Sequence, residues 1–122
     1  MNSFEWYSPR IGAPIVSIAT YGLTFSSGAV EALGNAKFVM LGFDEERRII
    51  GVKACDEDNA KAIEFYGRIR NGYVRISNKD FIRFLESKMP EDFKVDSKAV
   101  KYFTRWDKEN EILTVDLNQP MD

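Results

Sequence analysis

Four basic side chains and one aromatic side chain lie between residues 68 and 79, a combination suited to binding phosphate groups. They are Arg68, Arg70, Tyr73, Arg75 and Lys79. Arginine can donate two parallel hydrogen bonds to phosphate oxygens, and such contacts position proteins on nucleic acids. We call these five residues the basic cluster and predict that they bind nucleic acid.

The segment that holds the basic cluster favours a β-hairpin. Asn71-Gly72 is a strong tight-turn signal, because both residues tolerate the left-handed backbone that the turn requires. Arg70 and Arg75 flank this turn, and Lys79 follows at the start of a predicted helix. The alternative is that the arginines only charge an exposed strand edge, as proteins often do to prevent aggregation.

Positive charge is concentrated in the middle of a chain that is acidic overall. The formal net charge is -2 over 122 residues, yet residues 68–105 carry ten Lys or Arg against five Asp or Glu. Such an asymmetry favours an anionic partner for this part of the chain.

The sequence contains no constellation typical of a catalytic or metal site. There is no histidine, which excludes acid–base catalysis by imidazole, and the one cysteine, Cys55, excludes a Cys/His zinc site and an intramolecular disulfide. The carboxylate pairs Asp44 with Glu46 and Asp56 with Asp58 fall in predicted turns. We therefore predict that the protein is not an enzyme and holds no cofactor or metal.

The sequence also permits predictions about the cellular location of the protein and about its partners. No stretch approaches the roughly 20 apolar residues of a membrane span, and residues 1–10 lack the pattern of a signal peptide. This predicts a cytoplasmic protein without membrane contact. Phe4, Trp6 and Tyr7 are candidates for contact with a protein partner or a second copy of the chain.

Two pairs of segments repeat at fixed offsets. Residues 43–52 align without gaps on residues 106–115, with four of ten positions identical. Residues 18–27 align on residues 69–78 at an offset of 51 residues, whereas the offset of the first pair is 63. The twelve additional residues of the second copy are predicted to lie around residues 89–96.

Each copy has the pattern of a hairpin, a helix and a second hairpin. Helices are predicted at residues 28–33 and 79–89, after the N-cap candidates Ser26-Ser27 and Ser77-Asn78, whose short polar side chains can accept a hydrogen bond from the first turn. The longer helix is predicted to bury one apolar face, made of Phe81, Phe84 and Leu85.

The predicted fold is therefore mixed α/β and β-rich, in one domain over residues 1–122. Repeat one covers about residues 15–53, a connector covers 54–65, and repeat two covers about 66–117. The acidic start of the connector predicts a short helix near residues 56–66. Since one unit alone would leave its apolar face uncovered, the two repeats are expected to form a small barrel with an internal pseudo-twofold axis.

The first copy resembles the AbrB-type swapped-hairpin, or cradle-loop barrel, family. The resemblance covers about residues 16–53 and depends on Ile18, Gly22-Leu23-Thr24-Phe25-Ser26 and Ala32-Leu33-Gly34 before the closing hairpin, with a degenerate second copy. The chain departs from the family pattern at Ser26, where the family has proline, and at Glu31, where arginine is common. One residue is also missing between Gly22 and Thr24.

The resemblance implies a barrel that two short chains build together in the family, and that two fused copies would build here. It also implies DNA binding by basic residues near the strand–helix region. The leading hypothesis is accordingly a bacterial-type regulatory or antitoxin-like protein that binds DNA through the basic cluster. The alternative is a protein-interaction or scaffold module on the same barrel that does not bind nucleic acid.

Overall fold

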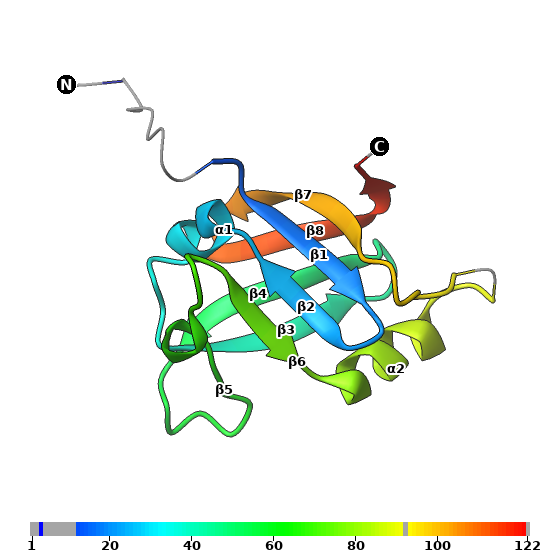
Figure 1. The fold of residues 1–122 in the computed structure, drawn as a ribbon, viewed down its shortest axis with the longest axis horizontal. Coiled ribbons are helices and arrows are strands. Elements are labelled where there is room, and N and C mark those ends of the chain that lie inside the picture. Colours follow the sequence, from blue (N-terminus) through cyan, green and yellow to red (C-terminus); the bar gives the residue numbers. More distant parts are fainter. Residues whose placement is uncertain (1–2, 4–11, 92, 122) are drawn as a thin grey trace.

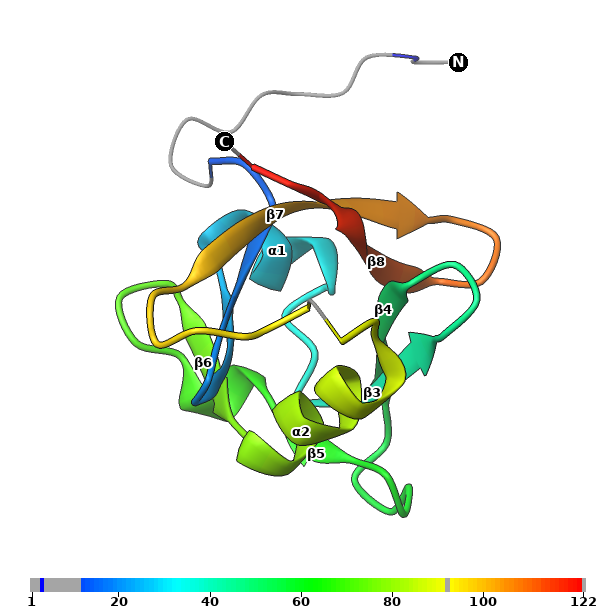
Figure 2. The same ribbon diagram turned by 90° about the vertical axis from the view of Figure 1, so that its right-hand side faces the viewer.

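The chain forms an antiparallel β-sheet that curls around the core. The computed structural model describes residues 3, 12–91 and 93–121, so Phe4, Trp6 and Tyr7 lie outside the described residues. Eight strands follow the order β5-β3-β4-β8-β7-β1-β2-β6 and bend into a half-barrel (Figure 1, Figure 2). They are β1 Ile15–Ala19, β2 Gly22–Phe25, β3 Phe38–Asp44, β4 Ile49–Cys55, β5 Ile63–Glu64, β6 Val74–Ser77, β7 Val100–Asp107 and β8 Ile112–Pro120. The predicted β-rich class is confirmed.

Alternating apolar residues give the sheet a buried inner face. In β1 and β2, Val16, Ile18, Leu23 and Phe25 are at most 3% exposed, as the period-two pattern predicts. Phe25 meets Phe65 edge to face, with ring centroids 4.9 Å apart. Other strands and both helices complete the core with Ala29, Val30, Val39, Ile50, Val52, Val74, Ile76, Ile82, Leu85, Leu113 and Val115.

Gly22 lets β6 approach β2 closely. Its φ of +143° lies outside the range that other residues adopt readily. A Cβ built on Gly22 would collide with the carbonyl oxygen of Ile76, at the point where Gly22 pairs with Ser77. Gly22 therefore permits the pairing of two strands that are distant in sequence.

Two helices, α1 Ser27–Ala32 and α2 Lys79–Lys88, begin after the predicted N-cap residues. The Ser26 hydroxyl accepts hydrogen bonds from the N–H groups of Ile15 (2.8 Å) and Ala29 (3.3 Å) and donates one to the carbonyl of Ala13 (2.9 Å). Asn78 Oδ1 accepts a bond from the N–H of Phe81 at 2.9 Å. Neither helix has the length and apolar character that crossing a membrane requires, and this holds for every helix in the described residues.

The predicted connector helix near residues 56–66 is wrong. This segment contains turns and β5, followed by the 3₁₀ helix η1 at Tyr66–Arg68. The reason is tertiary: Ile63 pairs with Val39 of β3, and Phe65 is fully buried against the core. These contacts outweigh the helical preference of the acidic residues, which act only locally.

The predicted apolar face of α2 needs one correction. Ile82 and Leu85 are buried, Phe81 is partly buried, and Phe84 is 44% exposed. Phe84 instead lies beside Phe43, with ring centroids 6.4 Å apart. The buried side of α2 is centred on Ile82 and Leu85, which the i, i+3 spacing of Phe81 and Phe84 does not identify.

The β3–β4 and β7–β8 hairpins have tips with the same chemistry. Asp44 accepts hydrogen bonds from the backbone N–H and the guanidinium of Arg47, and Asp107 accepts them from the backbone N–H and the side-chain amide of Asn110. The side-chain bond from Arg47 is the main cause that lowers the pKa of Asp44 from 3.8. The side-chain bond from Asn110 does the same for the pKa of Asp107.

These lowered pKa values predict a pH-dependent stability. A carboxyl whose pKa is lower in the folded state stabilises the fold above the unfolded-state pKa of about 4, and loses that effect as pH falls through the folded-state pKa. In Asp44→Asn/Asp107→Asn the amide oxygens can still accept the backbone bonds. The difference in urea-unfolding free energy between this variant and wild type should be largest above about pH 5 and shrink below about pH 4. A constant difference from pH 7 to pH 3 would contradict the assignment.

Candidate nucleic-acid interface

Three members of the basic cluster share one face of the sheet. Arg70 and Tyr73 exchange two backbone hydrogen bonds, of 2.8 and 2.9 Å, and so close the predicted Asn71-Gly72 turn. Both turn residues have positive φ, as this tight turn requires. Opposed side chains of an antiparallel pair point the same way, and Arg75 lies two residues beyond Tyr73, which directly precedes β6. Arg70, Tyr73 and Arg75 therefore face outward together.

Arg75 is held in place by an aromatic ring. Its guanidinium carbon lies 4.4 Å from the ring centroid of Tyr21, in the turn between β1 and β2. At this distance the guanidinium makes a cation–π contact with the ring. Tyr21 thus restrains the exposed Arg75 side chain.

The other two members of the basic cluster, Arg68 and Lys79, do not lie at outward-facing positions of a strand. Arg68 is in η1, and its Nε lies 3.8 Å from Glu64 Oε1. Both side chains are about half exposed, so water screens the pair, but the carboxylate still offsets the positive charge of Arg68. Lys79 is the first residue of α2, two positions beyond the end of β6.

Strand pairing extends the outward face beyond the basic cluster. Arg75 is the register partner of Thr24, Thr24 of Ser17, and Ser17 of Lys101, so four strands contribute one row of side chains. Adjacent strands are about 4.8 Å apart, which makes the row about 14 Å long. A basic group lies at each end, with two hydroxyls between them.

Farther along β7, Phe103 and Arg105 occupy the next outward positions. Phe103 is 58% exposed and lies opposite Ile15, and Arg105 is also exposed. Among the outward positions of β1, β2, β6 and residues 101–105 of β7 there is no carboxylate. We call this surface the outer basic face, which comprises Ser17, Thr24, Arg70, Tyr73, Arg75, Lys101, Phe103 and Arg105.

Sequence reasoning missed Lys101, Phe103 and Arg105. The local signal was present, since these residues alternate with Tyr102 and Thr104, which are buried. What the sequence lacked was the partner of β7, because β1 lies more than 80 residues earlier. Burial also raises the pKa of Tyr102, whose ring belongs to the inner face.

One hydroxyl in the row is unpaired. Oγ1 of Thr24 is buried and has no hydrogen-bond partner among the described residues. An unpaired buried polar group destabilises the fold, whereas an apolar isostere removes the cost. Thr24→Val should therefore raise the free energy of unfolding by about 1 kcal/mol in urea titrations.

Thr114 offers the matched control for that substitution. Its hydroxyl donates a 3.0 Å bond to the carbonyl of Arg105, so Thr114→Val should lower the free energy of unfolding by about 1 kcal/mol. If both substitutions change the free energy of unfolding equally, a hydrogen-bond partner for the hydroxyl does not determine its effect on stability.

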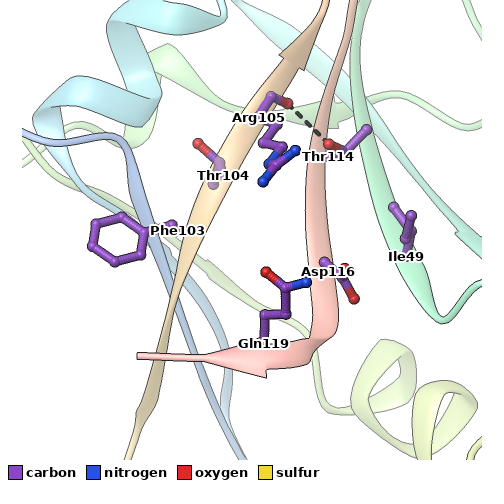
Figure 3. Close-up of a pocket in the computed structure, with 7 residues that line it drawn as sticks. All are labelled: Ile49, Phe103, Thr104, Arg105, Thr114, Asp116 and Gln119. Atoms are coloured by element: carbon purple, nitrogen blue, oxygen red, sulfur yellow. Dashed lines mark hydrogen bonds between the residues drawn. The ribbon is translucent and has the colours of Figure 1, made fainter. Parts of the chain in front are cut away.

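A hollow of about 410 Å³ adjoins the outer basic face where β7 and β8 lose register. Tyr102 pairs with Pro120 and Thr104 with Val115, so residues 116–119 lie opposite Phe103 alone and β8 bends sharply (Figure 3). We call this the bulge hollow. It is lined by Ile49, Phe103, Thr104, Arg105, Thr114, Asp116 and Gln119.

The bulge hollow contains hydrogen-bonding groups of both kinds. Arg105 has only donors, Gln119 has a donor and an acceptor, and Asp116 has a carboxylate. One oxygen of that carboxylate accepts bonds from the backbone N–H and the side chain of Asn118, both at 2.9 Å. Figure 3 shows Arg105 and Gln119 pointing toward the same space, whereas the Phe103 ring projects away from Gln119.

Neither metal-site geometry nor a comparison with known proteins identifies the function of these residues. Over the described part of the chain, no three His, Cys, Asp or Glu side chains are grouped so that they could hold a metal ion. No family model, no curated protein and no solved structure gave a significant match to this chain.

Proposed function

We propose that the chain is a cytoplasmic, bacterial-type regulatory protein that binds DNA through the outer basic face. The observation that carries the proposal is the concentration of Arg70, Arg75, Lys101 and Arg105 on the outer basic face, whose own positions include no carboxylate although Asp116 lines the adjoining bulge hollow, in a chain of net charge -2. Phosphates are attracted by such a local field even when the whole protein is acidic. The exposed rings of Tyr73 and Phe103 add surfaces on which bases can stack.

The proposal includes a duplicated, AbrB-like architecture, which the strand registers support. In the β4–β8 ladder Gly51 pairs with Thr114, its equivalent in the 63-residue repeat. In the β2–β6 ladder Thr24 pairs with Arg75, its equivalent at an offset of 51. A twofold axis relating two copies would pass through such self-paired positions. The repeated hairpin tips at Asp44 and Asp107 agree with this origin.

A protein-interaction module is the second candidate, because aromatic rings also gather elsewhere on the surface. Phe84 is 44% exposed, stacks on Phe81 with centroids 6.1 Å apart, and lies edge-on to Phe43. Exposed aromatic groups of this kind are common at protein interfaces. This patch is independent of the outer basic face, so the two candidates can be tested separately.

The test is binding of labelled oligonucleotides, measured by fluorescence anisotropy. At about 50 mM salt the proposal expects saturable binding that weakens steeply as salt rises, because bound phosphates release counterions. Both a duplex and a single strand are titrated. Failure of both to bind at low salt would overturn the proposal and leave the protein-interaction module as the better candidate.

A further inference from the structure

We propose that the outer basic face takes single-stranded nucleic acid and that one unpaired base enters the bulge hollow. This inference rests on the proposed function and specifies the form of its ligand. It begins from the shape of the surface. The outer basic face is made of strands, and the helices α1 and α2 direct their buried residues into the core instead of projecting from this face.

Exposed rings on a strand surface favour unpaired bases. Tyr73 is 52% exposed and Phe103 is 58% exposed, although the other outward positions of these strands carry polar or small side chains. In a duplex the faces of the bases are already stacked, whereas in a single strand they are available to protein rings. Arg75 and Lys101, each two residues from one of these rings, can hold the backbone.

The bulge hollow has the chemistry of a base-edge site. Asp116 lines the same hollow as Arg105 and disfavours a phosphate there, but it can accept hydrogen bonds from the amino groups of a base. Arg105 and Gln119 can donate to ring nitrogens and carbonyl oxygens. An unpaired base exposes both kinds of group on its Watson–Crick edge, which a duplex hides. The hollow volume of about 410 Å³ is within the usual range of small-ligand sites.

Two neighbouring bases of one strand can bind at the Phe103 ring and in the bulge hollow at the same time. Phe103 and Arg105 are two residues apart on β7, which places their side chains about 7 Å apart along the strand. Because the Phe103 ring projects away from Gln119, it can stack on one base while the next base occupies the bulge hollow (Figure 3). Lys101, one position farther along the same side of β7, lies where the backbone phosphates would pass.

The experiment compares a labelled single-stranded DNA, an RNA of the same sequence and the DNA duplex, by anisotropy at about 50 mM salt. Single strands should bind at least about ten-fold more tightly than the duplex. Phe103→Ala and Gln119→Ala should each weaken single-strand binding, by about 5- to 100-fold for the stacking ring, with little change for the duplex. The affinities measured for the DNA and the RNA show which kind of single strand the outer basic face prefers.

Phe84→Ala is the matched control for Phe103→Ala, since it removes an exposed phenyl ring from α2. Phe103→Trp keeps a stacking ring and should bind single strands more tightly than Phe103→Ala. Equal affinity for single strands and duplex, or equal losses in Phe103→Ala and Phe84→Ala, would overturn this inference while the proposed function stands. Failure of every oligonucleotide to bind would overturn both.

Discussion

Gly22→Ala is expected to lower the free energy of unfolding by at least about 3 kcal/mol. The new Cβ would collide with the carbonyl of Ile76 and lie 2.9 Å from the N–H nitrogen of Asn78, and the φ of +143° would strain the backbone further. Neither contact atom belongs to a flexible side chain, so β2 and β6 must separate. Urea unfolding monitored by circular dichroism measures the loss.

Gly42→Ala is the control for this substitution. Gly42 lies in β3, has no positive φ, and a Cβ there would meet nothing within 4 Å. Its effect on the free energy of unfolding should stay within about 0.5 kcal/mol. If both variants unfold alike, the close approach of β2 and β6 does not hold in solution.

Arg70→Ala/Arg75→Ala is expected to weaken nucleic-acid binding roughly 10- to 100-fold at low salt. Each lost phosphate contact also lowers the dependence of log affinity on log salt by about 0.7 to 0.9, so the slope should fall by roughly 1.5. Anisotropy titrations at several salt concentrations give both quantities. The fold should persist, because both side chains are exposed.

Arg83→Ala/Lys108→Ala removes the same net charge from positions outside the outer basic face. Arg83 lies on α2, 3.2 Å from Asp80, and Lys108 lies in the β7–β8 turn. This control should bind nearly as wild type does. If it loses as much affinity and as much salt dependence as the first variant, binding responds to net charge alone and not to the outer basic face.

Local signals in the sequence predicted the Asn71-Gly72 turn and both helix starts. This turn and the caps Ser26 and Asn78 depend on hydrogen bonds between residues close in the chain, so the local sequence is enough to predict them. The hairpin predicted around the turn is reduced to one bridge between Arg70 and Tyr73, and η1 precedes it. Tyr21, which contacts Arg75, was not anticipated because it comes from the turn between β1 and β2.

Contacts between distant segments account for what the sequence did not predict. The connector became a strand because Phe65 is buried against Phe25, forty residues earlier in the chain. Phe84 was predicted on the buried face of α2, but that face is centred on Ile82 and Leu85. Three of the eight residues of the outer basic face come from β7, whose neighbour β1 no local pattern identifies.

The sheet order has a consequence for synthesis of the chain. The hairpin β7–β8 lies between β4 and β1 in the sheet, although its residues are the last of the strands to leave the ribosome (Figure 1). Until then, the segments that form β1, β2 and β6 and those that form β3, β4 and β5 have no strand to join them. Both would present open edges to other nascent chains. The closing hairpin therefore covers these edges only after all the other strands have been synthesised.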